Sequence, residues 1–230
     1  ETDMDVPIWP TSTSTVWESA INLTSNYSNE VAFIHVPPDS VQKNQYGTFD
    51  IYIEDFKIGG STGKVLYVLM PPGGKITRIY SRNGFSFDAS ANDMQIIVAY
   101  VNEGLKFDAT TMKWDVAEPA QKLDNNGRPF NPAQPANGSS WEFTDGGKFK
   151  AISNKDYAGN LMFYTQKDII WNYWKDASFV GSWFTTGTMK VGGHFKLAGQ
   201  LIAGKLEFTN DVTGDFRYVP IDPPEIDPTI

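Results

Sequence analysis

Aromatic side chains are the residues of this chain whose types and spacing best suit a binding site. In the run Trp171-Asn172-Tyr173-Trp174, strand alternation places Trp171 and Tyr173 on one side and Trp174 on the other. Planar rings on a flat β surface pack against the apolar C–H faces of sugars, while amides and carboxylates bind the hydroxyls. We therefore predict a platform for sugar rings, with core filling as the alternative role of these aromatics. The candidate ligand-binding residues are Trp171, Tyr173, Trp174 and Trp183, with Trp114 and Trp141 beside a long loop as a second platform.

Catalytic patterns are sparse in this sequence. The chain has no cysteine and two histidines, and His35 in an apolar run and His194 at a glycine corner are both expected to be structural. Acidic and basic residues of the C-terminal half could line one face and cleave a polysaccharide, as paired carboxylates do in glycosidases. These residues are Asp168, Asp176, Asp211 and Asp215, with Lys167, Lys175 and Arg217. We expect them in solvated turns and at strand ends, and we assign no catalytic residue.

One short run resembles the start of a calcium-binding loop, namely Asp124-Asn125-Asn126-Gly127. An EF-hand loop needs a glutamate at its twelfth position, which here is Pro135. We therefore expect no cofactor and no metal ion, with an oxygen-rich calcium site of another kind as the alternative.

The composition restricts the partners and the location of the protein. The 230 residues carry 19 Lys and Arg against 27 Asp and Glu, for a net charge of −8. Such a surface repels phosphates, so we expect no nucleic-acid partner. The longest apolar run, residues 65–70, is too short for membrane insertion, and from the first residues we expect no signal peptide. Abundant Gly, Thr, Ser, Asn and aromatic residues are typical of an extracellular all-β protein, either secreted or attached to the cell surface.

Alternating apolar residues predict an all-β fold with little helix. In residues 48–54, the apolar Phe49, Ile51 and Ile53 share one side of a strand. Further strands are predicted at 65–70, buried on both sides, at 75–80 and at 94–101. Prolines and Asn-Gly pairs break the pattern between residues 115 and 140, which we predict as a long irregular loop. The predicted units are an extended lead-in (1–15), a single all-β domain (16–220) and a tail or linker rich in Pro and Asp (221–230).

An internal repeat predicts how the C-terminal strands are arranged. Residues 179–184 match residues 197–202 at an offset of 18, residues 187–191 match residues 204–208 at an offset of 17, and a looser copy spans 160–171. Units of two short strands and one corner cannot bury their own faces, so they must stack. We predict a parallel β-solenoid (β-helix) in at least the C-terminal half, with two similar β-hairpins as the alternative. The predicted inward-facing residues are Val191, Leu197, Leu201, Leu206 and Phe208.

The most regular part of the repeat resembles the terminal coils of bacterial surface β-helix proteins. The resemblance is carried by residues 191–206, which read Val-Gly-Gly-His-Phe-Lys-Leu-Ala-Gly-Gln-Leu-Ile-Ala-Gly-Lys-Leu, and by residues 215–220. The similar families are the choice-of-anchor and fibro-slime type and the pilus-associated cellulose-binding adhesins that include the tāpirins. The resemblance spans residues 160–220, and residues 1–153 align with none of these families. It implies surface display and adhesion, and it assigns no individual site residue.

Together these patterns predict a non-catalytic extracellular carbohydrate-binding domain. Such a domain attaches a bacterial cell or a secreted complex to an insoluble polysaccharide, such as cellulose or another plant cell-wall glycan. A β-helix polysaccharide lyase or glycoside hydrolase is the first alternative, and a structural cell-surface or pilus-associated protein is the second. An ice-binding solenoid would need regular ranks of threonine, whereas only Thr185, Thr186 and Thr188 cluster. The sequence leaves the oligomeric state open.

Overall fold

A computed structural model describes most of the chain, and the described part is built of β-strands. The described residues are 20–24, 26, 30–41, 48–61, 63–89, 94–116, 148–151, 157–209 and 212–220, without the side chains of 89, 151 and 173–176. Among them, the one helical element is a 3-10 helix of three residues, Ala158–Asn160. None of the same residues belongs to a helix that is long and apolar enough to span a membrane.

Twelve strands form one large sheet, and two short strands form a separate hairpin. The strands of the large sheet are β1 (Ile21–Leu23), β2 (Glu30–His35), β3 (Phe49–Ile53), β4 (Phe56–Gly59), β5 (Lys64–Met70), β6 (Thr77–Ser81), β7 (Phe85–Ala89), β8 (Met94–Val101), β11 (Phe149–Ala151), β12 (Leu161–Thr165), β13 (Ile169–Phe208) and β14 (Thr213–Tyr218). The hairpin pairs β9 (Phe107–Asp108) with β10 (Lys113–Trp114). The predicted all-β fold is therefore confirmed.

Three series of parallel strands run through the large sheet. The first series is β1, β4, β7 and β13. The second is β2, β5, β8, β13 and β14, and the third is β3, β6, β12 and β13. The chain visits the series in a fixed order, so each round adds one strand to every series. An insertion that contains β9, β10 and β11 separates β8 from β12 and interrupts this order once.

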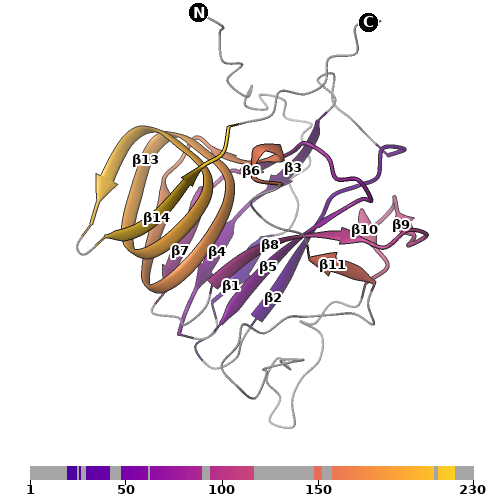
Figure 1. Ribbon diagram of the computed structural model, residues 1–230, viewed down its shortest axis with the longest axis horizontal. Coiled ribbons are helices and arrows are strands. Elements are labelled where there is room, and N and C mark those ends of the chain that lie inside the picture. Colours follow the sequence, from indigo (N-terminus) through magenta and orange to yellow (C-terminus); the bar gives the residue numbers. More distant parts are fainter. Residues whose placement is uncertain are drawn as a thin grey trace, which may run out of the picture.

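Strand β13 continues the same order without a break and curls round in successive turns beside β14 (Figure 1). Its residues 169–173 pair with β7, residues 177–178 with β8 and residues 182–185 with β12. Glycines that correspond in the sequence repeat lie against one another. A Cβ added to Gly199 would lie 1.9 Å from the carbonyl oxygen of Gly181, and one added to Gly204 would lie closest to the carbonyl oxygen of Thr186, with that of Gly187 at 3.2 Å. Successive turns of β13 therefore contact one another close to the repeated glycines.

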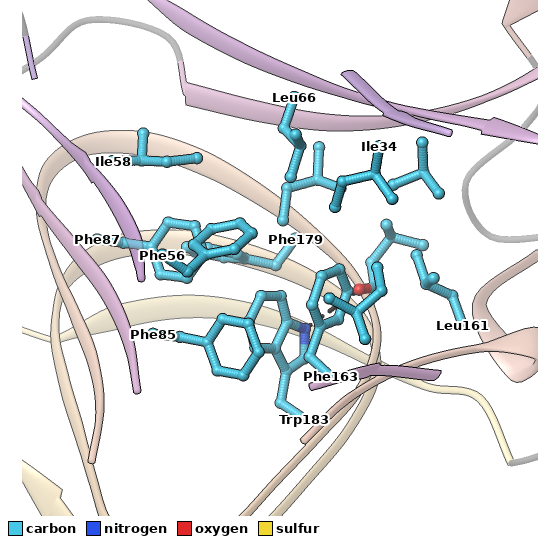
Figure 2. Packing of buried hydrophobic residues seen from close by; sticks show 14 of the residues in the cluster. Ile34, Phe56, Ile58, Leu66, Phe85, Phe87, Leu161, Phe163, Phe179 and Trp183 are labelled. Atoms are coloured by element: carbon cyan, nitrogen blue, oxygen red, sulfur yellow. Dashed lines mark hydrogen bonds between the residues drawn. The ribbon is translucent and has the colours of Figure 1, made fainter. Parts of the chain in front are cut away.

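The main core is made of side chains from all three series. Figure 2 shows aromatic and aliphatic residues of this cluster pointing toward one another around the indole of Trp183. Two buried hydroxyls at the carboxyl ends of third-series strands have partners. Thr165 Oγ1 donates to the carbonyl oxygen of Ser81 at 2.8 Å, and Thr185 Oγ1 donates to that of Lys167. Burial with hydrogen bonds intact keeps these polar groups from destabilising the core.

A second cluster lies on the opposite side of the second series. Along β5, Leu66, Val68 and Met70 belong to the main core, whereas Val65, Tyr67 and Leu69 belong to this outer cluster. Residues of the insertion cover it, namely Leu105, Phe107, Trp114 and Phe149. Every residue of β5 is consequently buried, as the continuous apolar run at 65–70 predicts.

The predicted strands and inward-facing residues can now be compared with the structure. The strands predicted at 48–54, 65–70, 75–80 and 94–101 are confirmed as β3, β5, β6 and β8. Among the residues predicted to face inward, Val191 and Leu197 are buried and Leu201 is half-buried. Inward burial is wrong for Leu206 and Phe208, which are 46% and 65% exposed because no described strand packs beyond them. The lead-in, residues 117–140 of the predicted loop and the tail lie outside the described residues.

Candidate functional site

Two of the tryptophans predicted to bind sugar lie inside the main core. Trp171 is 1% exposed and Trp183 is fully buried. The ring of Trp183 stacks on Phe163 with 3.9 Å between ring centroids, and the ring of Trp171 stacks on Phe179 at 4.0 Å. Because the protein's own rings occupy these faces, the prediction of an exposed platform is wrong for Trp171 and Trp183. The alternative, core filling, is the role that the structure gives them.

Trp114 is also buried, in the outer cluster. Its indole Nε1 donates to the carbonyl oxygen of Val36 at 2.9 Å, and its backbone N–H donates to His35 Nδ1 at 3.1 Å. The ring of Trp114 lies 5.0 Å from that of Phe107. Trp114 therefore holds the insertion against β2, so its prediction as a platform is wrong, and His35 has the structural role expected of it. The side chains of Tyr173 and Trp174 and the whole of Trp141 lie outside the described residues.

The charged residues singled out in the sequence do not gather into one acidic face among the described residues. Asp168 Oδ2 lies 3.1 Å from the ammonium of Lys190, which the sequence analysis did not select. Asp215 and Arg217 lie on β14, where all six residues are exposed. Lys167 is exposed beside Asp168. Lys175 and Asp176 have no described side chain, and Asp211 lies outside the described residues.

A strip of hydrogen-bonding groups runs along the outer side of the first series. We define the polar strip as Asp88, Asp168, Asn172, Lys190, Lys205 and Glu207. Its members face outward because their neighbours along the strand, such as Trp171, Met189 and Val191, are buried. Adjacent members are paired: Asn172 Nδ2 donates to Asp88 Oδ1 at 3.0 Å, and Lys205 Nζ lies 2.5 Å from Glu207 Oε1. Exposed fractions of 39% for Lys190 and 44% for Asp168 show that this pair is accessible to a ligand.

Two carboxylates of the polar strip, Asp168 and Glu207, are stabilised in their ionised form. The backbone N–H of Thr188, followed by the ammonium of Lys190, holds the pKa of Asp168 below its usual value. Lys205 lowers the pKa of Glu207, and Glu207 in turn raises the pKa of Lys205. A general acid for glycoside cleavage needs the opposite, a raised carboxyl pKa. Fixed charges of this kind suit hydrogen bonds to hydroxyl groups.

An aromatic row on the outer side of the third series was missed by the sequence analysis. The row consists of Tyr52, Tyr80, Tyr164 and Phe184, which occupy one register position on β3, β6, β12 and β13. From the first ring to the last, the centroids of neighbouring rings lie 5.0, 5.4 and 4.7 Å apart. The two middle rings are 1% and 3% exposed, so the row is packed rather than open. A signal was present, because each ring follows an inward-facing apolar residue in the triplets Asp50-Ile51-Tyr52, Arg78-Ile79-Tyr80, Met162-Phe163-Tyr164 and Ser182-Trp183-Phe184.

Neither a metal centre nor a known relative identifies the site. Within the described ranges, no three His, Asp or Glu residues lie close enough together to hold a metal ion, and the loop at 124–127 falls outside those ranges. Comparisons with protein-family models, with curated proteins and with solved structures found no match. The resemblance to bacterial surface β-helix families therefore stays a prediction.

Proposed function

We propose that this chain is a non-catalytic extracellular carbohydrate-binding domain that attaches a bacterial cell or a secreted complex to an insoluble polysaccharide such as cellulose. The polar strip is the observation that carries this proposal. Its carboxylates accept hydrogen bonds, its ammonium groups donate them, and its amide does both. Neighbouring strands of a sheet lie about 4.8 Å apart, and the strip has members on more than one of them. A polymer with regularly spaced hydroxyls can contact several of these strands at once.

We propose in addition that the three series are the three faces of one parallel β-solenoid. The in-register parallel pairs and the stacked glycines at offsets of 18 and 17 support this arrangement. Solenoids are built by repetition of one unit, which keeps equivalent side chains in straight columns. Polar groups held in fixed positions on neighbouring strands bind a polymer without first having to be ordered, which favours affinity.

The charges of the strip favour a neutral polysaccharide. Three carboxylates, those of Asp88, Asp168 and Glu207, stand against two ammonium groups, those of Lys190 and Lys205. The chain as a whole carries a net charge of −8, which repels polyanions. Cellulose, xylan and chitin therefore fit better than pectate or a sulfated glycan.

A depletion assay on insoluble polysaccharides tests the proposal, with microcrystalline cellulose, xylan and chitin as probes and sugar release measured in the same tubes. We expect the protein to be depleted from solution by at least one of these polymers without release of reducing sugar. Lys190→Ala and Asn172→Ala each remove groups worth about 1 kcal/mol, so each should weaken binding by about fivefold. The matched control is Arg82→Ala, because Arg82 and Glu54, which directly follow β6 and β3 of the third series, form an ion pair of similar exposure and are not members of the polar strip.

The outcomes separate this proposal from its alternatives. Depletion that Lys190→Ala weakens and Arg82→Ala leaves unchanged supports binding through the polar strip. Equal binding by all three variants and the parent protein would show that the polar strip is not part of the binding site. Release of soluble sugar would favour the lyase or hydrolase alternative. No depletion on any polymer would contradict the carbohydrate proposal altogether.

A structural role in a cell-surface assembly is the second candidate function. The observation that favours it is the group of exposed apolar side chains at the end of β13 and on β14. Such a role predicts self-association in the absence of any glycan. That association is a separate property, and it is argued from its own residues below.

A further inference from the structure

Large exposed apolar side chains gather at one end of the described structure. They are Leu206 and Phe208 at the end of β13 and Phe216 and Tyr218 on β14, with exposed fractions of 46%, 65%, 47% and 68%. We call these four residues the exposed end. Contiguous exposed apolar residues on a soluble domain commonly mark an interaction surface.

The exposed end continues the interior of the protein rather than its outer surface. In the pairing of β13 with β14, Phe216 lies beside Leu197 and Gly214 beside Phe195. Leu197 and Phe195 are 2% and 7% exposed, so Phe216 stands on the core-facing side of the next strand. Tyr218 lies beside Gly199 on that same side. The exposed end is therefore the last layer of the core, and no described residues cover it.

Strand β14 is also the edge of its series. Among the described residues it pairs with β13 on one side and with no strand on the other. An open strand edge presents unpaired N–H and C=O groups that bind another strand readily. Exposed apolar side chains and an open strand edge thus lie on the same surface. One added strand would bury the side chains and would form hydrogen bonds with the edge.

The sequence of β14 matches itself in the antiparallel direction. The run is Gly214-Asp215-Phe216-Arg217-Tyr218, with opposite charges at equal distances on either side of Phe216. When two such strands pair antiparallel about Phe216, each Asp215 stands opposite an Arg217 and each Gly214 stands opposite a Tyr218. Opposite charges in directly opposed positions stabilise a strand pair, and an aromatic ring packs well over a facing glycine.

We propose that a second copy of this chain covers the exposed end, with β14 pairing antiparallel with β14 of the other copy about a two-fold axis through Phe216. Such an interface is isologous and closes after two copies. Residues 204–208 repeat the same order of residue types, Gly-Lys-Leu-Glu-Phe, with the charges reversed. Their Leu206 and Phe208 belong to the exposed end and become buried between the two copies.

The opposite end of the molecule argues against a head-to-tail stack. The first strands of the three series contribute Leu23, Ile34 and Phe49 to the core, and these are only 7%, 4% and 2% exposed. A head-to-tail contact needs two complementary open ends, and a covered first layer offers none to the exposed end. A two-fold contact needs only the exposed end itself.

Charge exchange on β14 tests both the dimer and its register, with sedimentation velocity over a range of protein concentrations as the measurement. We expect reversible dimers with a Kd on the order of 10 μM, as befits a small interface. Asp215→Arg and Arg217→Asp each place like charges opposite one another and should raise the Kd at least tenfold. Dimers should return in a mixture of the two variants, where the two arginines of one face the two aspartates of the other. They should also return in the double variant D215R/R217D.

Each outcome decides the proposal. A parent protein that stays monomeric at every concentration overturns it, and so do single variants that dimerise as the parent does. Failure of both the mixture and the double variant to dimerise overturns the register and with it the proposal. Circular dichroism checks the fold of each variant, and Phe216→Asp, which brings two carboxylates together on the two-fold axis, is a second variant expected to be monomeric. Asp215 and Arg217 lie outside the polar strip, so polysaccharide depletion by these variants is independent of the result.

Discussion

The strands up to β8 and the last turns of β13 and β14 differ in the length of chain that separates paired strands. Paired residues up to β8 lie far apart, such as Phe49 and Thr77 at an offset of 28 and Ile21 and Phe56 at an offset of 35. In the later region the offset falls to 20 for Met162 and Ser182 and to 19 for His194 and Thr213. Both regions nevertheless form the same in-register parallel pairs. The core is therefore set by the stacking of strands, and the length of the loops between them does not disturb it.

The longer connecting segments of the first region cover surfaces that stay exposed in the last region. Beside β5 and β8, the outer cluster buries Tyr67 and Leu69 beneath the insertion. In the last region the outer side of β13 carries the polar strip, and the exposed end has no described cover. The short repeat thus leaves surfaces open that the longer segments of the first region cover, and the open surfaces are the ones available for binding.

The largest expected loss of stability comes from replacing Trp183, whose ring contacts both regions. Trp183 stacks on Phe163 and contacts Phe85 and Phe87 edge to face, so Trp183→Ala removes contacts to both regions. We expect a loss of about 3–5 kcal/mol in the free energy of unfolding, measured by urea denaturation. Its outward-facing neighbour Phe184 is half-buried, and Phe184→Ala should cost only about 1 kcal/mol. Equal losses for the two variants would contradict the distinction between core and outer row.

A smaller effect is expected where two turns of the last region touch through glycine. A Cβ on Gly199 would meet the carbonyl oxygen of Gly181 at 1.9 Å, so Gly199→Ala forces two turns apart. We expect a loss of about 2–3 kcal/mol. The control is Gly73→Ala in the first region, where φ is +87° but no atom lies within 4 Å of an added Cβ. That variant strains the backbone alone, at about 1 kcal/mol, and thermal unfolding of both variants measures the difference. A Gly199→Ala protein as stable as the control would show that the turns do not touch at this position.

Much of the fold could be predicted from residue alternation and from the repeat, and the errors have physical causes. Phe49, Ile51 and Ile53 alternate with polar residues, which fixes their side of β3. The repeat predicted that Leu206 and Phe208 are buried, but a pattern along the chain does not tell where stacking stops. Both residues are consequently exposed.

The candidate site was harder to predict than the fold. Asn172 beside Trp171 was the available sign that Trp171 faces inward, because a polar residue on the outer side turns its neighbours toward the core. Asp88 meets Asn172, and Asp168 meets Lys190, only through contacts between strands, at sequence separations of 84 and 22, so no local pattern joins them. The burial of Trp114 depends on its contact with Val36 and His35, which are more than seventy residues away.

The smallest expected effect is a loss of stability at alkaline pH that originates outside the last turns. Burial, followed by the carboxylate of Asp50, raises the pKa of Tyr52 from 10 to about 12, and burial raises the pKa of Tyr80 and of Tyr157 as well. Below pH 10 these tyrosines are neutral in both the folded and the unfolded chain. Above pH 10 the unfolded chain releases their protons first, so the free energy of unfolding falls as the pH rises toward 12. Urea midpoints across this interval, with tyrosinate absorbance as a second signal, measure the slope. Tyr52→Phe should make the slope shallower while leaving the stability at neutral pH nearly unchanged, and an unchanged slope would show that Tyr52 ionises alike in the folded and unfolded chain.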